Sequence, residues 1–130
     1  MGIVVGYLAT PEGHAALDAA IDEAKRRSVS VVVVLSARPD ESEERREQAE
    51  RDLARVRDEL DAAGVAHDVR LLAGGDAADD LISTAEQVGA ELVVLGLRRR
   101  SPVGKLILGS NAQRVLFDAP CAVLTVKPAG

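Results

Sequence analysis

The sequence predicts an α/β protein: a single domain over residues 1–130 with an open, doubly wound sheet of five parallel strands and four helices. Five short apolar runs alternate with four segments of helical periodicity, as expected when helices cover both faces of a parallel sheet. A chain of 130 residues can bury about two thirds of its unfolded surface around one core. No linker, low-complexity segment or repeat beyond the strand–helix units divides it.

The predicted strands are short and mostly aliphatic. The second and fourth are continuous apolar runs, which suit central strands buried on both faces. The third alternates apolar with charged residues, so we expect it nearer an edge of the sheet. The runs are GIVVGY from Gly2, VSVVVVLSA from Val29, AHDVRLL from Ala66, AELVVLG from Ala90 and CAVLTV from Cys121.

Capping residues predict the start of the first helix, the end of the second and both ends of the third. Thr10 caps the first helix, and Pro11 suits its first turn. The second helix has a highly charged, solvated face and ends at Gly64, and the third runs from a cap at Asp76 to Gly89. The apolar face of the first helix consists of Leu17, Ala20, Ile21 and Ala24. That of the second consists of Ala49, Leu53, Val56, Leu60 and Ala63, and that of the third of Leu81, Ile82, Ala85 and Val88.

The fourth helix is predicted to begin at Ser110, with Gln113 completing a capping box. Ligands of open parallel sheets bind at the carboxyl ends of the strands, where the winding reverses. Two strand orders are common for five strands. With the order 3-2-1-4-5, the crevice lies between strands 1 and 4, with residues 8–10 on one wall and residues 96–115 on the other.

The chain as a whole is acidic, but one of its segments is basic. The net charge of -5 and the aromatic content of 2% argue against nucleic acid and anionic membranes as partners. Between Leu92 and Phe117 the sign reverses, since this segment contains no acid. An anion is the natural partner of such a segment, and a solvated loop is the alternative. Its basic residues are Arg98, Arg99, Arg100, Lys105 and Arg114.

The remaining reactive side chains form no catalytic set. Cys121 is the single cysteine, which excludes an internal disulfide and fits a reducing compartment. We interpret Cys121 as a core residue, and His14 and His67 as structural, because neither histidine has the spacing of a metal site. With no leader and no apolar run near the ~20 residues of a bilayer span, we expect a cytoplasmic protein without a membrane segment.

Three phosphate-related motifs fail at the positions where they are needed. A receiver domain requires acids after the first strand, but residues 7–9 are Tyr, Leu and Ala. A Walker A loop requires Ser or Thr after its Gly-Lys pair, but Leu106 follows here. A dinucleotide fingerprint requires several glycines after the first strand, where only Gly6 occurs. We therefore expect no enzymatic activity.

The connection from strand 4 to helix 4 is the strongest candidate site. Gly96 allows close backbone approach, and Gly109 and Ser110 offer free N–H groups, a hydroxyl and the positive end of a helix dipole. This arrangement suits an anion. Equally, Gly109 can serve only to shape the turn and Ser110 only to cap the helix.

Several segments, in the right order and spacing, resemble the universal stress protein family over essentially the whole chain. They are IVVGY followed by the Thr-Pro-Glu-Gly helix start, ELVVLG, LGSNAQRVL and APCAVLTVKP. The resemblance implies the adenine nucleotide α-hydrolase-like fold.

In ATP-binding members of that family, the connection contains Gly, two residues, Gly, nine residues, Gly and then Ser or Thr. Gly96 and the Gly109-Ser110 pair match, but Arg99 stands in place of the second glycine. The acid that ends the first strand in such members is replaced by Leu8.

The resemblance implies a stress-response domain with ATP or AMP in the strand 1/strand 4 crevice. Gly96, Gly109, Ser110 and Asn111 would meet the phosphates, and Thr10 would line the opposite wall. Arg98 and Arg99 would supply charge-assisted contacts. The alternative is a member that has lost ATP binding, as Leu8 and Arg99 indicate, and that acts through its dimer surface and partners.

The resemblance also implies a homodimer formed through the last strand, Ala122 to Val126. This strand is apolar and uncharged up to Lys127. An edge strand of this kind is prone to aggregation unless it is covered, and a partner strand would cover it.

Overall fold

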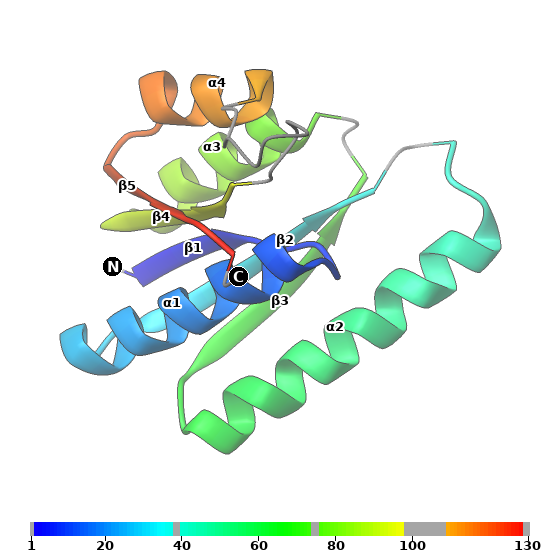
Figure 1. Cartoon of the computed structure of the whole chain (residues 1–130), viewed down its shortest axis with the longest axis horizontal. Helices are drawn as coiled ribbons and strands as arrows, with labels where there is room; N and C mark the ends of the chain where they lie inside the picture. Colours follow the sequence, from blue (N-terminus) through cyan, green and yellow to red (C-terminus); the bar gives the residue numbers. More distant parts are fainter. Residues whose placement is uncertain (1, 38–39, 74–75, 98–108, 129–130) are drawn as a thin grey trace.

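The computed structural model describes residues 2–37, 40–73, 76–97 and 109–128. Strands and helices alternate strictly along these residues, and the sheet lies between two layers of helices (Figure 1). The elements are β1 (Gly2–Gly6), α1 (Pro11–Arg27), β2 (Ser30–Ser36), α2 (Glu43–Ala63), β3 (His67–Leu72), α3 (Ala77–Val88), β4 (Leu92–Gly96), α4 (Ser110–Asp118) and β5 (Ala122–Val126).

The sheet has the order β3-β2-β1-β4-β5, and all four pairings are parallel. In the central register Val4 lies opposite Val32 on one side and Val93 on the other. The predicted fold class and strand order are thus confirmed. The third strand is at an edge, as its alternating pattern indicates, and Asp68 and Arg70 form an ion pair there (2.8 Å).

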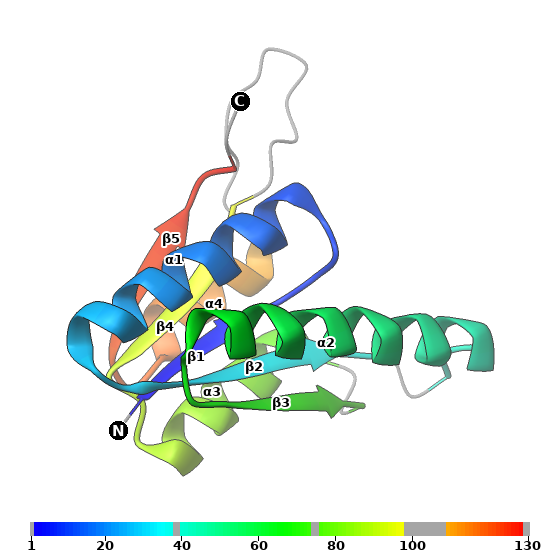
Figure 2. The ribbon, with the colours of Figure 1, turned by 90° about the horizontal axis from the view of Figure 1, so that it is seen from below.

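Helices α1 and α2 cover one face of the sheet, and α3 and α4 cover the other (Figures 1 and 2). Successive residues of a strand point to opposite faces. Ile3 and Val5 therefore pack with α1 and α2, whereas Val4 packs with α3 and α4. Because both layers are apolar, the central strands are continuous hydrophobic runs with side chains almost fully withdrawn from water.

The helix ends follow the predicted capping residues in three helices. The Thr10 hydroxyl accepts a hydrogen bond from the Gly13 N–H at 3.2 Å, and Asp76 accepts one from the Asp79 N–H at 3.1 Å. Gly64 ends α2 and Gly89 ends α3, both in the left-handed conformation. No helix in the described part of the chain is long and apolar enough to cross a bilayer.

One helix end differs from the sequence prediction, and another lies where the sequence made none. The N-cap of α4 is Gly109, with the extended backbone of a cap, and Ser110 is the first helical residue. The predicted Ser110–Gln113 capping box is therefore wrong, because Ser110 lies one position too far into the helix to cap it. Helix α1 ends at Arg27, and its C-cap is Ser28, a non-glycine residue with φ of 56° that no local signal indicated.

Candidate functional site

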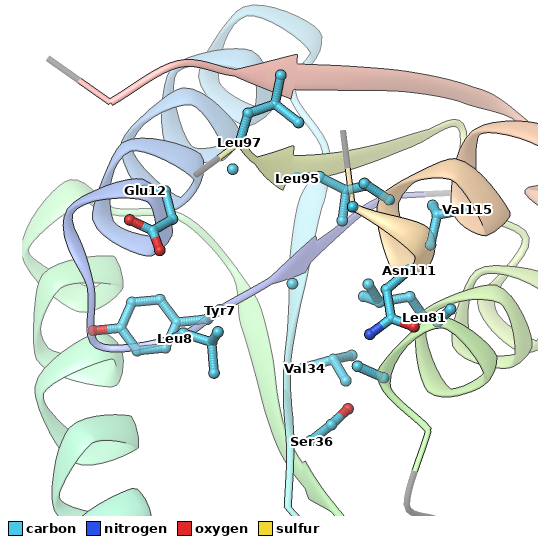
Figure 3. Close-up of a pocket in the computed structure, with 16 residues that line it drawn as sticks. Tyr7, Leu8, Glu12, Val34, Ser36, Leu81, Leu95, Leu97, Asn111 and Val115 are labelled. Carbon is cyan, nitrogen blue, oxygen red and sulfur yellow. The ribbon is translucent and has the colours of Figure 1, made fainter. Parts of the chain in front are cut away.

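A pocket of about 260 Å³ opens at the carboxyl ends of β1, β2 and β4 (Figure 3). The first turns of α1, α3 and α4 complete its wall. This is the predicted crevice between strands 1 and 4, widened toward β2. Most of its side chains are apolar; they are Tyr7, Leu8, Val34, Ala77, Ala78, Leu81, Leu95, Leu97, Ala112 and Val115. The polar ones, apart from the Tyr7 hydroxyl, are Glu12, Ser36 and Asn111.

The expected site residues divide into three groups. Gly96, Gly109 and Asn111 line the pocket, from the end of β4 and the start of α4. Thr10 and Ser110 are not among the lining residues, and the Thr10 hydroxyl caps α1 instead. Two further expected residues, Arg98 and Arg99, lie outside the described residues.

Gly96 joins the pocket wall to α1. A Cβ atom at this position would lie 2.1 Å from the carbonyl oxygen of Glu12 and 3.0 Å from the Glu12 Cβ. Only glycine therefore lets the end of β4 approach the first turn of α1 this closely. The predicted close backbone approach at Gly96 is thus present, and its partner in the structure is the protein backbone.

Leu8 stands at the position where the family resemblance implies an acid. Its side chain lines the pocket and is 53% exposed, and it belongs to the turn between β1 and α1. A leucine here gives the pocket an apolar surface where a carboxylate would accept hydrogen bonds.

Glu12 is a lining residue that the sequence interpretation missed. It lies half-buried in the first turn of α1, on the same side of the pocket as Tyr7 and Leu8, with Asn111 on the opposite side (Figure 3). No hydrogen bond or ion pair joins its carboxylate to another residue that the structure describes. In the sequence, the Thr-Pro-Glu-Gly segment indicates a helix start and belongs to the family resemblance, and neither indicates that its glutamate lines the crevice.

Ser36 and Asp80 connect β2 to α3 at the pocket. The Ser36 hydroxyl donates a hydrogen bond to the Asp80 carboxylate at 2.8 Å in a half-buried position. The Ser36 oxygen therefore keeps only acceptor capacity toward a ligand.

In the basic segment between Leu92 and Phe117, Arg114 forms ion pairs with acids from another part of the fold. Arg114 of α4 pairs with Asp76 at 3.0 Å and with Asp79, both at the start of α3. The hydrogen bond from the Asp79 N–H, with Arg114 nearby, lowers the pKa of the Asp76 carboxyl. Arg114 is thus engaged within the protein, while the other four cations of the segment lie outside the described residues.

The histidines and the cysteine have structural surroundings. The ring of His14 contacts Tyr7 edge-on at 5.5 Å, and His67 Nδ1 lies 2.8 Å from the Val65 carbonyl oxygen. Cys121 is half-buried against the α3 and α4 side of the core, and burial raises the pKa of its thiol. Among the described residues, no group of three or more His, Cys, Asp or Glu side chains could hold a metal ion.

The strand order, the two helical layers and the pocket beside β1 and β4 define a doubly wound α/β protein with the adenine nucleotide α-hydrolase-like fold. A family model for the universal stress protein family matches residues 1–127. The chain belongs to the universal stress protein family.

Individual relatives match over nearly the whole chain. A universal stress protein from Mycolicibacterium smegmatis is 42% identical over 128 residues, which cover 98% of each protein. The solved structure of a universal stress protein from Archaeoglobus fulgidus has a TM-score of 0.83 at 33% identity, covering 98% of each chain. A second structure from that organism, in complex with dAMP, has a TM-score of 0.80 at 27% identity and the same coverage.

Proposed function

We propose that this protein is a stress-response domain that binds an adenine nucleotide, ATP or AMP, in the pocket between β1 and β4. One observation carries the proposal. Gly96 and Gly109, the two ends of the family's glycine motif, line the same pocket together with Asn111. The A. fulgidus relative that was determined with dAMP shares this fold at 27% identity.

The physical character of the pocket suits a nucleotide. Apolar side chains such as Val34 and Leu95 offer a surface for a flat base. The N-terminus of α4 has no side-chain cap among the described residues, and it presents its first N–H groups and the positive end of its dipole, which favour phosphate. The volume of about 260 Å³ is close to the lower end of small-molecule sites, about 300 Å³.

The expected residues have distinct roles in this proposal. Gly109 and Asn111 meet the phosphates, and Ser110 adds a backbone N–H from the first turn of α4. Arg98 and Arg99 supply charge in place of the missing glycine. Thr10 acts indirectly, since its hydroxyl holds the first turn of α1 against the pocket. The protein is not an enzyme in this proposal, and hydrolysis of bound ATP is at most slow and incidental.

Isothermal titration tests the proposal directly. The protein is first freed of co-purified nucleotide by denaturation and refolding, and is then titrated with AMP, ADP and ATP, with and without Mg²⁺. We expect micromolar dissociation constants for at least one of them. The absence of heat up to millimolar nucleotide would overturn the proposal.

Leu8 favours a second candidate, a member that has lost nucleotide binding and acts through its partners. The leucine removes a polar contact from the site and presents a half-exposed apolar side chain at the pocket. In this second proposal the pocket is silent in the titration and the dimer surface carries the function.

We also propose that two copies pair through β5. This strand forms one edge of the sheet, and its last four residues are half-buried without a charge among them. A partner strand would satisfy the outward N–H and C=O groups of this edge.

A further inference from the structure

The two sides of α4 differ in what they contact. Arg114 forms ion pairs with Asp76 and Asp79 at the start of α3, so one side of the helix is joined to its neighbour. Leu116 follows two positions later, which turns it by about 200° around the helix axis. Its side chain therefore lies on the side of α4 away from α3, where it is 39% exposed.

The side of α4 away from α3, which we call the outer flank, borders an edge of the sheet. Val115, on the adjoining face of the helix, belongs to one apolar cluster with Val93 of β4 and Val123 of β5, so α4 lies over the last two strands. Strand β5 ends the sheet on that side (Figure 1). The outer flank carries no charge and consists of Ala112, Gln113 and Leu116.

Pairing of β5 alone would give a small interface between two copies. The strand has five residues, whereas a stable interface uses about 20–30 residues and about 800 Å² on each side. The surface beside the strand must therefore take part if the dimer is stable. Leu116 is one of three large hydrophobic side chains that are exposed in the described part of the chain, and it lies next to this edge.

A two-fold axis across β5 brings the outer flanks of two copies together, because such a dimer places the same surface of each copy against the other. Neighbouring strands are about 4.8 Å apart, so two helices that each lie over β4 and β5 would stand about 10 Å apart, a usual distance for packed helices. The small side chain of Ala112 permits this approach, and Leu116 supplies apolar surface at the contact.

We propose that a second copy of this chain docks on the outer flank of α4, so that the dimer buries Leu116 between the two α4 helices as well as pairing the two β5 strands. This inference rests on the proposed dimer and assigns to it a helix surface in addition to the strand. Phe117 stays outside the contact. It is 84% exposed, but it lies about 200° from Val115 around the helix axis and so points away from the sheet.

Sedimentation equilibrium tests the proposal through the dimer dissociation constants of the unchanged protein, Leu116→Glu, Leu116→Lys and Phe117→Glu. Phe117→Glu is the matched control, because it places the same carboxylate on the next residue of α4 but outside the outer flank. An equimolar mixture of Leu116→Glu and Leu116→Lys is measured as well, since opposite charges can then meet across the two-fold axis. Thermal unfolding followed by circular dichroism verifies that each variant is folded.

We expect each Leu116 variant alone to dimerise at least about 10-fold more weakly, because like charges then face each other across the interface. The mixture should recover part of this loss, and Phe117→Glu should keep the dissociation constant of the unchanged protein. An unchanged dimer for Leu116→Glu, equal losses for Leu116→Glu and Phe117→Glu, or no recovery in the mixture would overturn the role of the outer flank without affecting the pairing of β5. If the unchanged protein is a monomer, the proposed dimer itself fails.

Discussion

The Cα atom of Gly13 lies against the carbonyl oxygen of Leu8, so that a Cβ atom at residue 13 would be only 1.8 Å from this oxygen. The same oxygen accepts a hydrogen bond from the Thr10 N–H at 2.8 Å. The Thr10 hydroxyl in turn accepts a hydrogen bond from the Gly13 N–H. These contacts fix the turn between β1 and α1, and with it the positions from which Leu8 and Glu12 reach the pocket.

Replacing Gly13 by alanine should therefore destabilise the protein. The added methyl group meets backbone, which cannot move aside like a flexible side chain, so we expect a loss of about 3 kcal/mol, the upper part of the usual range for overpacking. Urea unfolding measures the change.

Gly64→Ala is the matched control for this substitution. Gly64 has a positive φ, but a Cβ there has nothing within 4 Å, so the change should cost about 1 kcal/mol in backbone strain alone. A loss at Gly13 no larger than at Gly64 would contradict the close packing of Gly13 against Leu8.

Ser28 offers the opposite experiment. It is exposed and holds the left-handed conformation at the end of α1, with φ of 56°. Ser28→Gly should stabilise the protein by about 0.5–1 kcal/mol, because glycine relieves the strain but loses more chain entropy on folding. The urea midpoint should rise with an unchanged slope. Ser28→Ala keeps the strain, so a similar gain from alanine would refute this explanation.

Local signals explain most of what the sequence predicted correctly. The β-branched runs that predicted central strands have both faces buried, and the Thr10 and Asp76 caps depend on residues within three positions. The missed features depend on distant partners or on competing local geometry. The acids paired with Arg114 lie 35 and 38 residues before it, and Gly109 competes with Ser110 for the same cap.

The site was predicted less completely than the fold. Gly96, Gly109 and Asn111 were found because a spaced motif marks them. Glu12 was missed because, in the sequence alone, a helix start fully accounts for a glutamate at this position. Its place in the pocket wall depends on the tertiary fold, in which its backbone packs against Gly96 at the end of β4.

The ion pair between α3 and α4 should make stability depend on pH. The pKa of Asp76 is lowered from 3.8 in the folded state, chiefly by the Asp79 N–H and also by Arg114. Its ionised form therefore stabilises the fold above the ordinary pKa, and this contribution is lost as the pH falls through the lowered value.

Asp76→Asn isolates that contribution, because asparagine still caps the helix but carries no charge. We expect this variant to be less stable than the unchanged protein at neutral pH, and the difference to shrink as the pH falls below the ordinary pKa of an aspartate, 3.8, and through the lowered value. Urea unfolding across this range measures it. A difference that is constant with pH would show that the charge of Asp76 contributes nothing.

The outer edge of β5 allows a specific test of the proposed dimer. The Leu97 N–H donates to the Val126 carbonyl at 2.8 Å, so the peptide groups of Val126 face β4. Neighbouring residues of a strand alternate in direction, and the N–H of Thr125 therefore faces the open edge. Thr125→Pro should remove this donor and keep the pairing with β4, since proline is tolerated on edge strands.

We expect the unchanged protein to sediment as a dimer at micromolar concentration and Thr125→Pro to sediment as a folded monomer. Leu124→Pro is the control, because the Leu124 N–H faces β4 and its loss should unfold the sheet edge. Circular dichroism distinguishes the two results. A dimer that survives Thr125→Pro would place the interface elsewhere. If the unchanged protein is a monomer, β5 has no partner strand, and the second candidate function cannot depend on a dimer surface.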